Sequence, residues 1–131
     1  MDSTSIELPG SEIEGIELEQ DRLSIRFSKA LLIKTMTGSV ERTLWWHKGR
    51  LLLGGVEEAP EHLPQGPLTC DGGDVGENIY TYRDMIPLPL QSSGQVFCKL
   101  RFRGREEILA VHGRYIRLEM EAVPKYICHL R

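Results

Sequence analysis

The chain of 131 residues carries 19 acidic and 16 basic side chains, for a formal net charge of −3, and 40% of its residues are hydrophobic. This composition is typical of a globular protein, and the length suits a single domain that folds without disulfides or metals. The small negative charge gives no sign of a polyanionic partner, and no apolar run approaches the ~18 residues that suggest a membrane-spanning helix. We therefore expect neither nucleic acid nor membrane among its partners.

The cysteines and the N-terminal composition both predict an intracellular protein. Cys70, Cys98 and Cys128 are odd in number and widely spaced, which favours reduced thiols over a disulfide framework. The first residues are acidic and lack the order of basic, apolar and small residues of a signal peptide. We expect the protein in the cytoplasm.

The chain begins with a polar segment that contains Pro9-Gly10, and we expect residues 1–12 to be a flexible tail ahead of a single domain over residues 13–131. Apolar and polar residues then alternate on both sides of residues 19–22, which predicts a first β-hairpin. The alternation breaks at Lys29-Ala30, and a β-bulge near Ser28-Lys29 would restore the phase. A short helix over residues 29–34 is the alternative.

Residues 40–47 and 50–56 flank Lys48-Gly49, which predicts a second hairpin. The continuous run of leucines at 51–53 indicates a strand covered on both faces, and Gly54-Gly55 indicates a bend at its end. Trp45 and Trp46 are adjacent on a strand, so one should face the core. The outward one is a candidate stacking surface for a ligand or base, and the alternative is that a neighbouring loop packs over it.

Residues 57–76 are the least regular part of the chain, since three prolines and four glycines rule out a long helix or a central strand. We expect a long loop containing a short strand at residues 68–70. The loop carries three candidate ligand residues, His62, Asp71 and Asp74.

The residues of this loop suggest two kinds of chemistry, Ca²⁺ binding and catalysis by a cysteine–histidine pair. The carboxylates of Asp71, Asp74 and Glu77 suit Ca²⁺, but their spacing matches no EF-hand, and a solvated turn explains them. Cys70 and His62 lack the third partner that a catalytic dyad needs. The four histidines show no metal-ligand spacing either, so we expect no metal, no cofactor and no catalytic residue.

A strand is predicted over residues 78–82, followed by an extended segment ending at Leu90. Pro87 and Pro89 donate no backbone hydrogen bonds, so this segment should be an edge strand or a crossover. Its apolar residues Ile86 and Leu88 are candidates for an interface in a homo-oligomer or with a protein partner.

Residues 94–121 read as three antiparallel strands joined by turns at Arg103-Gly104 and Gly113-Arg114. These turns set Cys98 opposite Leu109, and they put one apolar set on a single face. The members of that set are Val96, Cys98, Leu100, Phe102, Leu109, Val111, Ile116, Leu118 and Met120.

Four cations occupy the outer face of the same meander: Lys99, Arg101, Arg103 and Arg117. The predicted register brings acidic residues beside them, with Glu106 opposite Arg101. Such cross-strand pairs stabilise a sheet, whereas binding to a phosphate backbone needs several unpaired cations. This stretch should therefore not bind nucleic acid.

Two resemblances concern the second half of the chain. Residues 80–90 (YTYRDMIPLPL), with Gly94, Gly113 and residues 124–127 (PKYI), are similar to small bacterial all-β proteins in families without an assigned activity. Residues 108–116 (ILAVHGRYI) resemble the second strand motif of Sm-like RNA-binding proteins, with His112 where that motif has arginine and without a clear partner motif upstream. The second resemblance implies RNA binding as a further alternative.

These patterns together predict an all-β fold, an antiparallel β-barrel or β-sandwich of about eight strands. The function that we expect is a non-enzymatic binding or assembly module. The alternative is a small-molecule or enzymatic site in the mouth of a barrel, built from the 57–76 loop.

Overall fold

A computed structural model describes residues 3–36, 38 and 41–130. It confirms the predicted all-β fold, because these residues form eight strands and no helix. Within the described residues, therefore, no helix is long and apolar enough to cross a membrane. The strands are β1 (Ser3–Glu19), β2 (Arg22–Thr35), β3 (Arg42–Gly54), β4 (Leu68–Glu77), β5 (Tyr80–Arg83), β6 (Met85–Leu88), β7 (Gln91–Phe102) and β8 (Ile108–Leu130).

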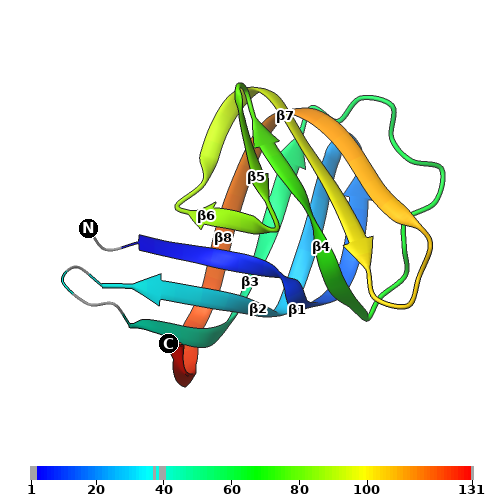
Figure 1. Cartoon of the computed structure of the whole chain (residues 1–131). Helices are drawn as coiled ribbons and strands as arrows, with labels where there is room; N and C mark the ends of the chain where they lie inside the picture. The colour runs from blue at the N-terminus through cyan, green and yellow to red at the C-terminus, as the bar shows by residue number, and fades with distance from the viewer. Residues whose placement is uncertain (1–2, 37, 39–40, 131) are drawn as a thin grey trace.

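Six of the strands close into a barrel-like ring (Figure 1). Antiparallel pairing runs from β1 through β2, β3, β8 and β7 to β4, and β4 returns to β1 where Glu12 pairs with Thr69 and Ile13 with Leu68. The two short strands lie outside this cycle, with β5 paired to β4 and β6 paired to β1. Closure leaves the six long strands without a free edge over the paired stretches.

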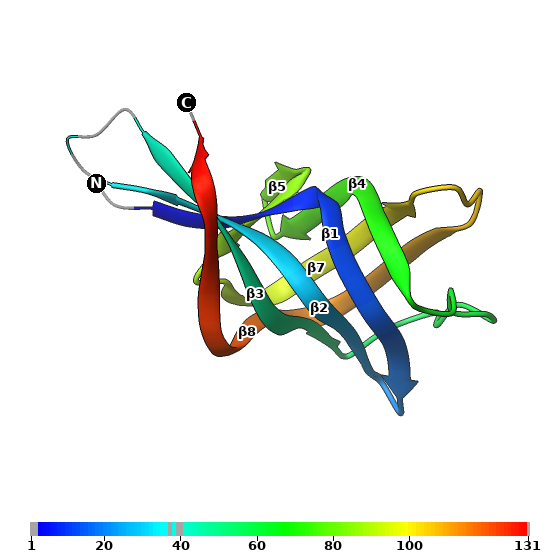
Figure 2. The ribbon, with the colours of Figure 1, turned by 90° about the horizontal axis from the view of Figure 1, so that it is seen from below.

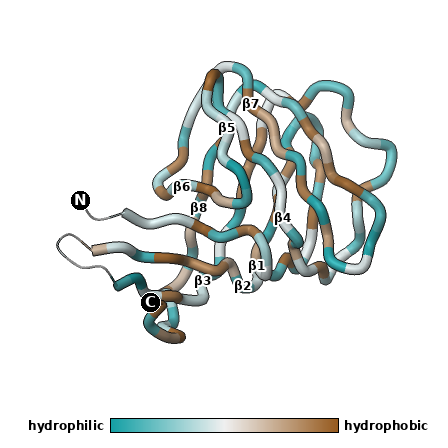
Figure 3. The backbone as a smooth tube through the Cα atoms, in the orientation of Figure 1, coloured by the Kyte–Doolittle hydropathy of each residue, from teal (hydrophilic) through white to brown (hydrophobic). Residues whose placement is uncertain are grey.

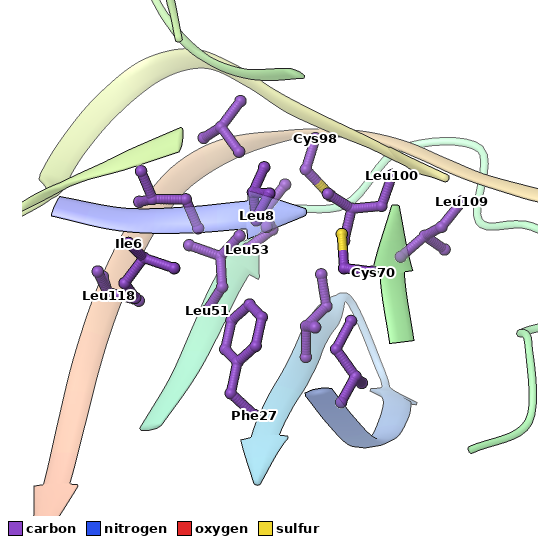
Figure 4. Close-up of a cluster of buried hydrophobic side chains, with 14 of the residues drawn as sticks. Ile6, Leu8, Phe27, Leu51, Leu53, Cys70, Cys98, Leu100, Leu109 and Leu118 are labelled. Atoms are coloured by element: carbon purple, nitrogen blue, oxygen red, sulfur yellow. The ribbon is translucent and has the colours of Figure 1, made fainter. Parts of the chain in front are cut away.

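One hydrophobic core fills the ring. Apolar and polar positions alternate along the strands, as Figure 3 shows, so each strand turns one face inward. Phe27, Leu51, Leu53 and Leu100 are fully buried, and they lie with Ile6 and Leu8 in the cluster of Figure 4. Burying side chains of this size contributes about 1.5–3 kcal/mol each.

A belt of bulges crosses four neighbouring strands at one level. The pairing of β1 with β2 shifts between Glu7 and Gly15, and that of β2 with β3 shifts between Phe27 and Ala30. On the other side of β3, residues 122–124 of β8 bulge out opposite His47, and β8 bends strongly there in Figure 2. The predicted bulge at Ser28-Lys29 is confirmed, and the alternative of a short helix is wrong.

The N-terminal residues from Ser3 onward belong to the sheet. Residues 3–7 pair with β2 on one side, and residues 4–7 pair with β6 on the other. Ile6 and Leu8 are completely buried. The expected tail over residues 1–12 is therefore wrong for residues 3–12, because their apolar side chains close one part of the core; residues 1 and 2 lie outside the described part of the chain.

Two predicted turns are instead close contacts inside long strands. Gly49 pairs with both β2 and β8, and a Cβ there would lie 2.7 Å from the carbonyl oxygen of Glu119. Gly113 lies within β8, where a Cβ would meet the carbonyl oxygen of Gly54 at 2.7 Å. Both glycines let neighbouring backbones approach, so the hairpins predicted at Lys48-Gly49 and Gly113-Arg114 are wrong.

The meander keeps its predicted buried face but not its predicted register. The loop between β7 and β8 spans residues 103–107, so Cys98 pairs with Val111 rather than Leu109. A shift of two residues preserves the inward face, and eight of the nine residues in the predicted apolar set are buried; the exception, Met120, is partly buried. Arg101 consequently meets Asp84 at 3.6 Å, and not Glu106, while Arg117 meets Glu119 at 3.0 Å.

The 57–76 segment divides into two parts. Residues 68–77 form β4, a central strand paired with β7 and β5, whereas the irregular link ends at Pro67. Gly72 and Gly73 make this possible, since both have positive φ and a side chain at Gly73 would overlap the Lys99 carbonyl. The following strand is β5, and β6 pairs only with β1 among the named strands, as expected of an edge strand.

Candidate functional site

The belt of bulges holds a cavity of about 400 Å³ with mostly apolar walls, which we call the Trp46 cavity. Six of its lining residues carry its chemistry: Lys29, Trp46, His47, Lys48, Val123 and Lys125. They come from β2, β3 and β8, and the bulges at residues 28–29 and 122–124 open the space between these strands. Bulges commonly re-aim side chains next to functional sites.

Trp46 and Lys29 lie together in this cavity. Trp46 is half-buried, and the Lys29 ammonium lies 5.5 Å from the centroid of its ring, within the range of a cation–π contact. The same ammonium is 3.9 Å from a carboxylate oxygen of Glu12, a long and exposed ion pair. Because exposed pairs of this kind contribute about 0–1 kcal/mol, Lys29 is only weakly held by Glu12.

Among the described residues the other two lysines form no ion pair, although the register of β3 and β8 places Glu121 opposite Lys48. Within the described part of the chain, no carboxylate lies within 4.0 Å of the ammonium group of Lys48 or Lys125. Lys125 pairs with Trp46 across β3 and β8, and both lysines are exposed. The cavity therefore carries three cations, and its lining includes no acidic residue.

The bulge of β8 is held open by a hydrogen bond and by its backbone. The Nε2 atom of His47 lies 3.1 Å from the carbonyl oxygen of Ala122, whose φ is 62°. The Nδ1 atom of the same ring is buried without a hydrogen-bond partner among the described residues. Val123 follows and is 82% exposed, so the bulge presents an apolar side chain at the cavity.

A second cavity of about 410 Å³, the Arg114 cavity, lies where the start of the 55–67 link meets β7 and β8. Its lining includes Glu57, Glu58, His112 and Arg114. Arg114 donates to Glu57 at 2.8 Å, and the Glu57 amide donates to the His112 carbonyl. These polar groups already have partners within the chain.

Trp45 faces the opposite side of β3 and packs against the core, as expected for one tryptophan of the pair. Its ring meets Tyr126 edge to face at a centroid distance of 5.3 Å, and the Lys34 ammonium lies 4.3 Å from its centroid. Its Nε1 donates to the Thr43 hydroxyl. The indole is thus enclosed by internal contacts.

The candidate residues of the 57–76 segment are not brought together with the tryptophans. His62 and Asp71 are exposed, and Asp74 lies 3.7 Å from Arg83. Neighbouring Glu77 accepts a hydrogen bond from Tyr82, which raises the pKa of that phenol. In the described residues no group of three or more histidines, cysteines or carboxylates is placed to hold a metal ion.

The candidate interface residues of β6 point inward. Ile86 is completely buried, and Leu88 packs against the core cluster. Their apolar side chains are used within the chain, because β6 covers the N-terminal part of β1.

Two of the thiols are buried in the core beside each other (Figure 4). Burial raises the pKa of Cys70 to about 11 and that of Cys98 to about 12. A thiol with such a pKa is a poor nucleophile at neutral pH, so the geometry does not support a Cys70–His62 dyad.

Sequence reasoning selected Trp46 but missed the three lysines and Val123. The bulge predicted at Ser28-Lys29 was a signal for Lys29, since bulges often adjoin sites. Lys125 and Val123 are 79 and 77 residues away from Trp46 along the chain, so only the pairing of β3 with β8 brings them together.

Comparisons with protein-family models, curated proteins and solved structures found no match for the chain. The two resemblances noted in the sequence therefore stay predictions.

Proposed function

We propose that the protein is a non-enzymatic binding module that takes a small organic ligand in the Trp46 cavity. The observation that carries this proposal is a half-buried tryptophan in a mostly apolar cavity of about 400 Å³ at a belt of bulges. Ligand cavities usually measure about 300–1,000 Å³ and combine apolar walls with a few polar groups. The Trp46 cavity meets both criteria.

The polar groups around the cavity favour binding over catalysis. The Ser28 hydroxyl donates to the Glu12 carbonyl, and Nε2 of His47 is engaged with the Ala122 carbonyl. A serine nucleophile would need its hydroxyl directed at a base, and a general base would need a free nitrogen directed at the reacting group. The Ser28 hydroxyl is not directed at a base, and the second His47 nitrogen, Nδ1, has no hydrogen-bond partner among the described residues but is buried away from a reacting group.

The Arg114 cavity is a weaker candidate, although it is nearly the same size and its lining includes two residues of the 57–76 segment. Its arginine is satisfied by Glu57, so a ligand would have to break that ion pair. We expected residues 57–76 to build the mouth of a site. Of these residues, Glu57 and Glu58 line the Arg114 cavity, and the others do not appear in its lining.

The test uses 8-anilinonaphthalene-1-sulfonate, whose emission rises in an apolar site. The dye should bind the folded protein with saturable 1:1 stoichiometry, and Trp46→Ala should lower its affinity by roughly tenfold, because the indole is the largest apolar side chain in the lining. In Trp45→Phe, which leaves Trp46 as the sole tryptophan, indole emission should change on titration.

Trp46→Phe is the matched control variant, since it leaves Trp45 as the sole emitter. The dye should still bind this variant, with a smaller loss of affinity than in Trp46→Ala, because phenylalanine keeps an aromatic ring at position 46. Equal dye affinity in the native protein and in Trp46→Ala, with both folded by circular dichroism, would contradict the proposal.

A further inference from the structure

We propose that the ligand of the Trp46 cavity is a planar aromatic anion, with its ring against the Trp46 indole and its carboxylate or phosphate among the lysine ammonium groups. This inference rests on the proposed function and specifies the class of ligand. It is carried by the charge of the cavity and by the distance between Lys29 and the indole.

The charge of the cavity is opposite to that of the whole chain. The chain has a net charge of −3, yet the lining of this cavity includes Lys29, Lys48 and Lys125 and no acidic residue. Like charges in one cavity repel one another, and a bound anion relieves that repulsion. A cationic ligand would add to it, so the cavity selects against amines.

Within the described part of the chain, three arginines of the sheet, unlike Lys48 and Lys125, are already paired with carboxylates. Arg101, Arg114 and Arg117 each meet a carboxylate oxygen within 3.6 Å. Lys48 and Lys125 have no such partner among the described residues, so their ammonium groups are available to an anion without breaking an ion pair. Cations left without partners beside an apolar wall are the groups that recognise a carboxylate or phosphate.

The shape of the ligand follows from Trp46 and Lys29. The Lys29 ammonium lies 5.5 Å from the centroid of the indole ring. Because this ammonium lies over the indole, a ligand ring that stacks on the same face takes its place, and the flexible Lys29 side chain can then bring the ammonium to the edge of the ligand ring. An anionic group attached to the ring directly or by one or two bonds reaches that ammonium. An anion on a long alkyl chain could also reach the ammonium, but it would gain no stacking on the indole, so the cavity favours the aromatic anion.

Glu12 is the natural competitor of this ligand, because its carboxylate lies 3.9 Å from the Lys29 ammonium. A bound anion would replace this contact. Glu12→Gln keeps the size of the side chain and removes the charge, so it should tighten the binding of an aromatic anion by about two- to threefold.

The experiment compares four probes by isothermal titration calorimetry: 2-naphthoate, 2-naphthylmethanol, 2-naphthylmethylammonium and octanoate. We expect 2-naphthoate to bind about tenfold more tightly than the alcohol and octanoate, and the amine to bind most weakly. The affinity for 2-naphthoate should fall as salt is raised, since screening weakens exposed charges. Naphthyl phosphate then distinguishes a phosphate ligand from a carboxylate one.

Three single variants locate the anion. Lys29→Met, Lys48→Gln and Lys125→Gln should each weaken 2-naphthoate binding about two- to fivefold and leave the alcohol unchanged. Lys99→Gln is the matched control: Lys99 is an exposed lysine on β7 outside the cavity, and its substitution should change neither affinity.

The outcomes separate the two proposals. Equal affinity for 2-naphthoate and the alcohol would overturn the anion assignment, and equal affinity for 2-naphthoate and octanoate would overturn the planar ring; either result leaves a ligand cavity in place. If none of the probes nor the anilinonaphthalene dye binds the folded chain, the proposed function itself is wrong. Tighter binding of single-stranded RNA than of naphthyl phosphate at the same lysines would replace the small ligand by a nucleic acid.

Discussion

The two cavities of this protein are nearly the same size but differ in how their charges are satisfied. In the Arg114 cavity the guanidinium is 2.8 Å from a carboxylate of Glu57, and the backbone of the same residue is tied to β8. In the Trp46 cavity three lysines and an indole line the same space, and of these lysines only Lys29 has a carboxylate within 4.0 Å among the described residues. The two candidate sites are thus not distinguished by volume, but by the unpaired charge that lies beside an apolar wall in one of them.

The strand positions explain this difference. The Arg114 cavity forms where the link from β3 crosses the outside of β7 and β8, and a cross-chain ion pair fastens the crossing. The Trp46 cavity forms inside the run of paired strands, where bulges in β2 and β8 separate the backbones on both sides of His47-Lys48. The Arg114 cavity therefore lies beneath a link that is held by an ion pair, whereas the Trp46 cavity lies at an interruption of the sheet pairing.

Both cavities depend on the common hydrophobic core, so substitutions in that core should have the largest effect on the protein. Leu100 is fully buried, so Leu100→Ala should lower the free energy of unfolding by roughly 2–5 kcal/mol. Leu118→Ala should fall in the same range, towards its lower end, since 8% of that side chain is exposed. Urea denaturation measures both; losses below about 1 kcal/mol at both positions would mean that the described core is wrong.

The core behind the cavities also carries a pH dependence. Burial raises the pKa of Cys70 to about 11 and that of Cys98 to about 12 in the folded state, whereas an unfolded thiol has a pKa near 8.5. The folded state therefore disfavours the thiolate. This contribution to stability is present below pH ~8.5 and is lost as the pH rises toward the folded values.

Two measurements check that prediction. The midpoint of thermal unfolding should fall as the pH is raised from about 8 to 10, and the fall should be smaller in Cys70→Ala than in the parent, with each compared to its own value at pH ~7. A thiol reagent at pH ~8 should label Cys128, which is partly exposed, and spare the other two. Rapid labelling of all three thiols in the folded protein would contradict the closed core.

A charge reversal sharpens the contrast between the two cavities. Lys48→Glu should weaken 2-naphthoate binding by tenfold or more, about 1.4 kcal/mol, since it replaces attraction by repulsion. Arg114→Glu makes the matching reversal in the other cavity and should leave that affinity unchanged. Equal losses in both variants, measured by calorimetry, would show that the net charge of the chain controls binding and not the Trp46 cavity.

The smallest expected effects concern stability at the exposed charges. Glu57→Gln removes an exposed ion pair and should lower the free energy of unfolding by at most about 1 kcal/mol. Lys125→Gln should leave stability within about 0.5 kcal/mol, or raise it slightly, because it removes one of three like charges. Denaturation of the two variants side by side tests this, and a loss above 1 kcal/mol in Lys125→Gln would mean that Lys125 has a structural partner.

The sequence by itself determined the fold class and most of the inward face. Alternation over Leu23, Ile25 and Phe27 identified one core strand, and the broken alternation after it located the bulge at Ser28-Lys29. The apolar set of the meander was also correct, because the two-residue period survives a shift of register by two. Local periodicity carries this information without reference to other strands.

The ends of the strands and the position of the candidate site could not be predicted from the sequence, because both depend on contacts between distant parts of the chain. Gly49 and Gly113 resemble turn residues in the sequence, but here they allow backbones to approach across strands, which depends on partners far away in the chain. The pairing of residues 3–7 with β2, and of residues 4–7 with β6, likewise makes an apparent tail part of the sheet. Lys125 reaches Trp46 only through the pairing of β8 with β3, and such long-range pairing leaves no local trace in the order of residues.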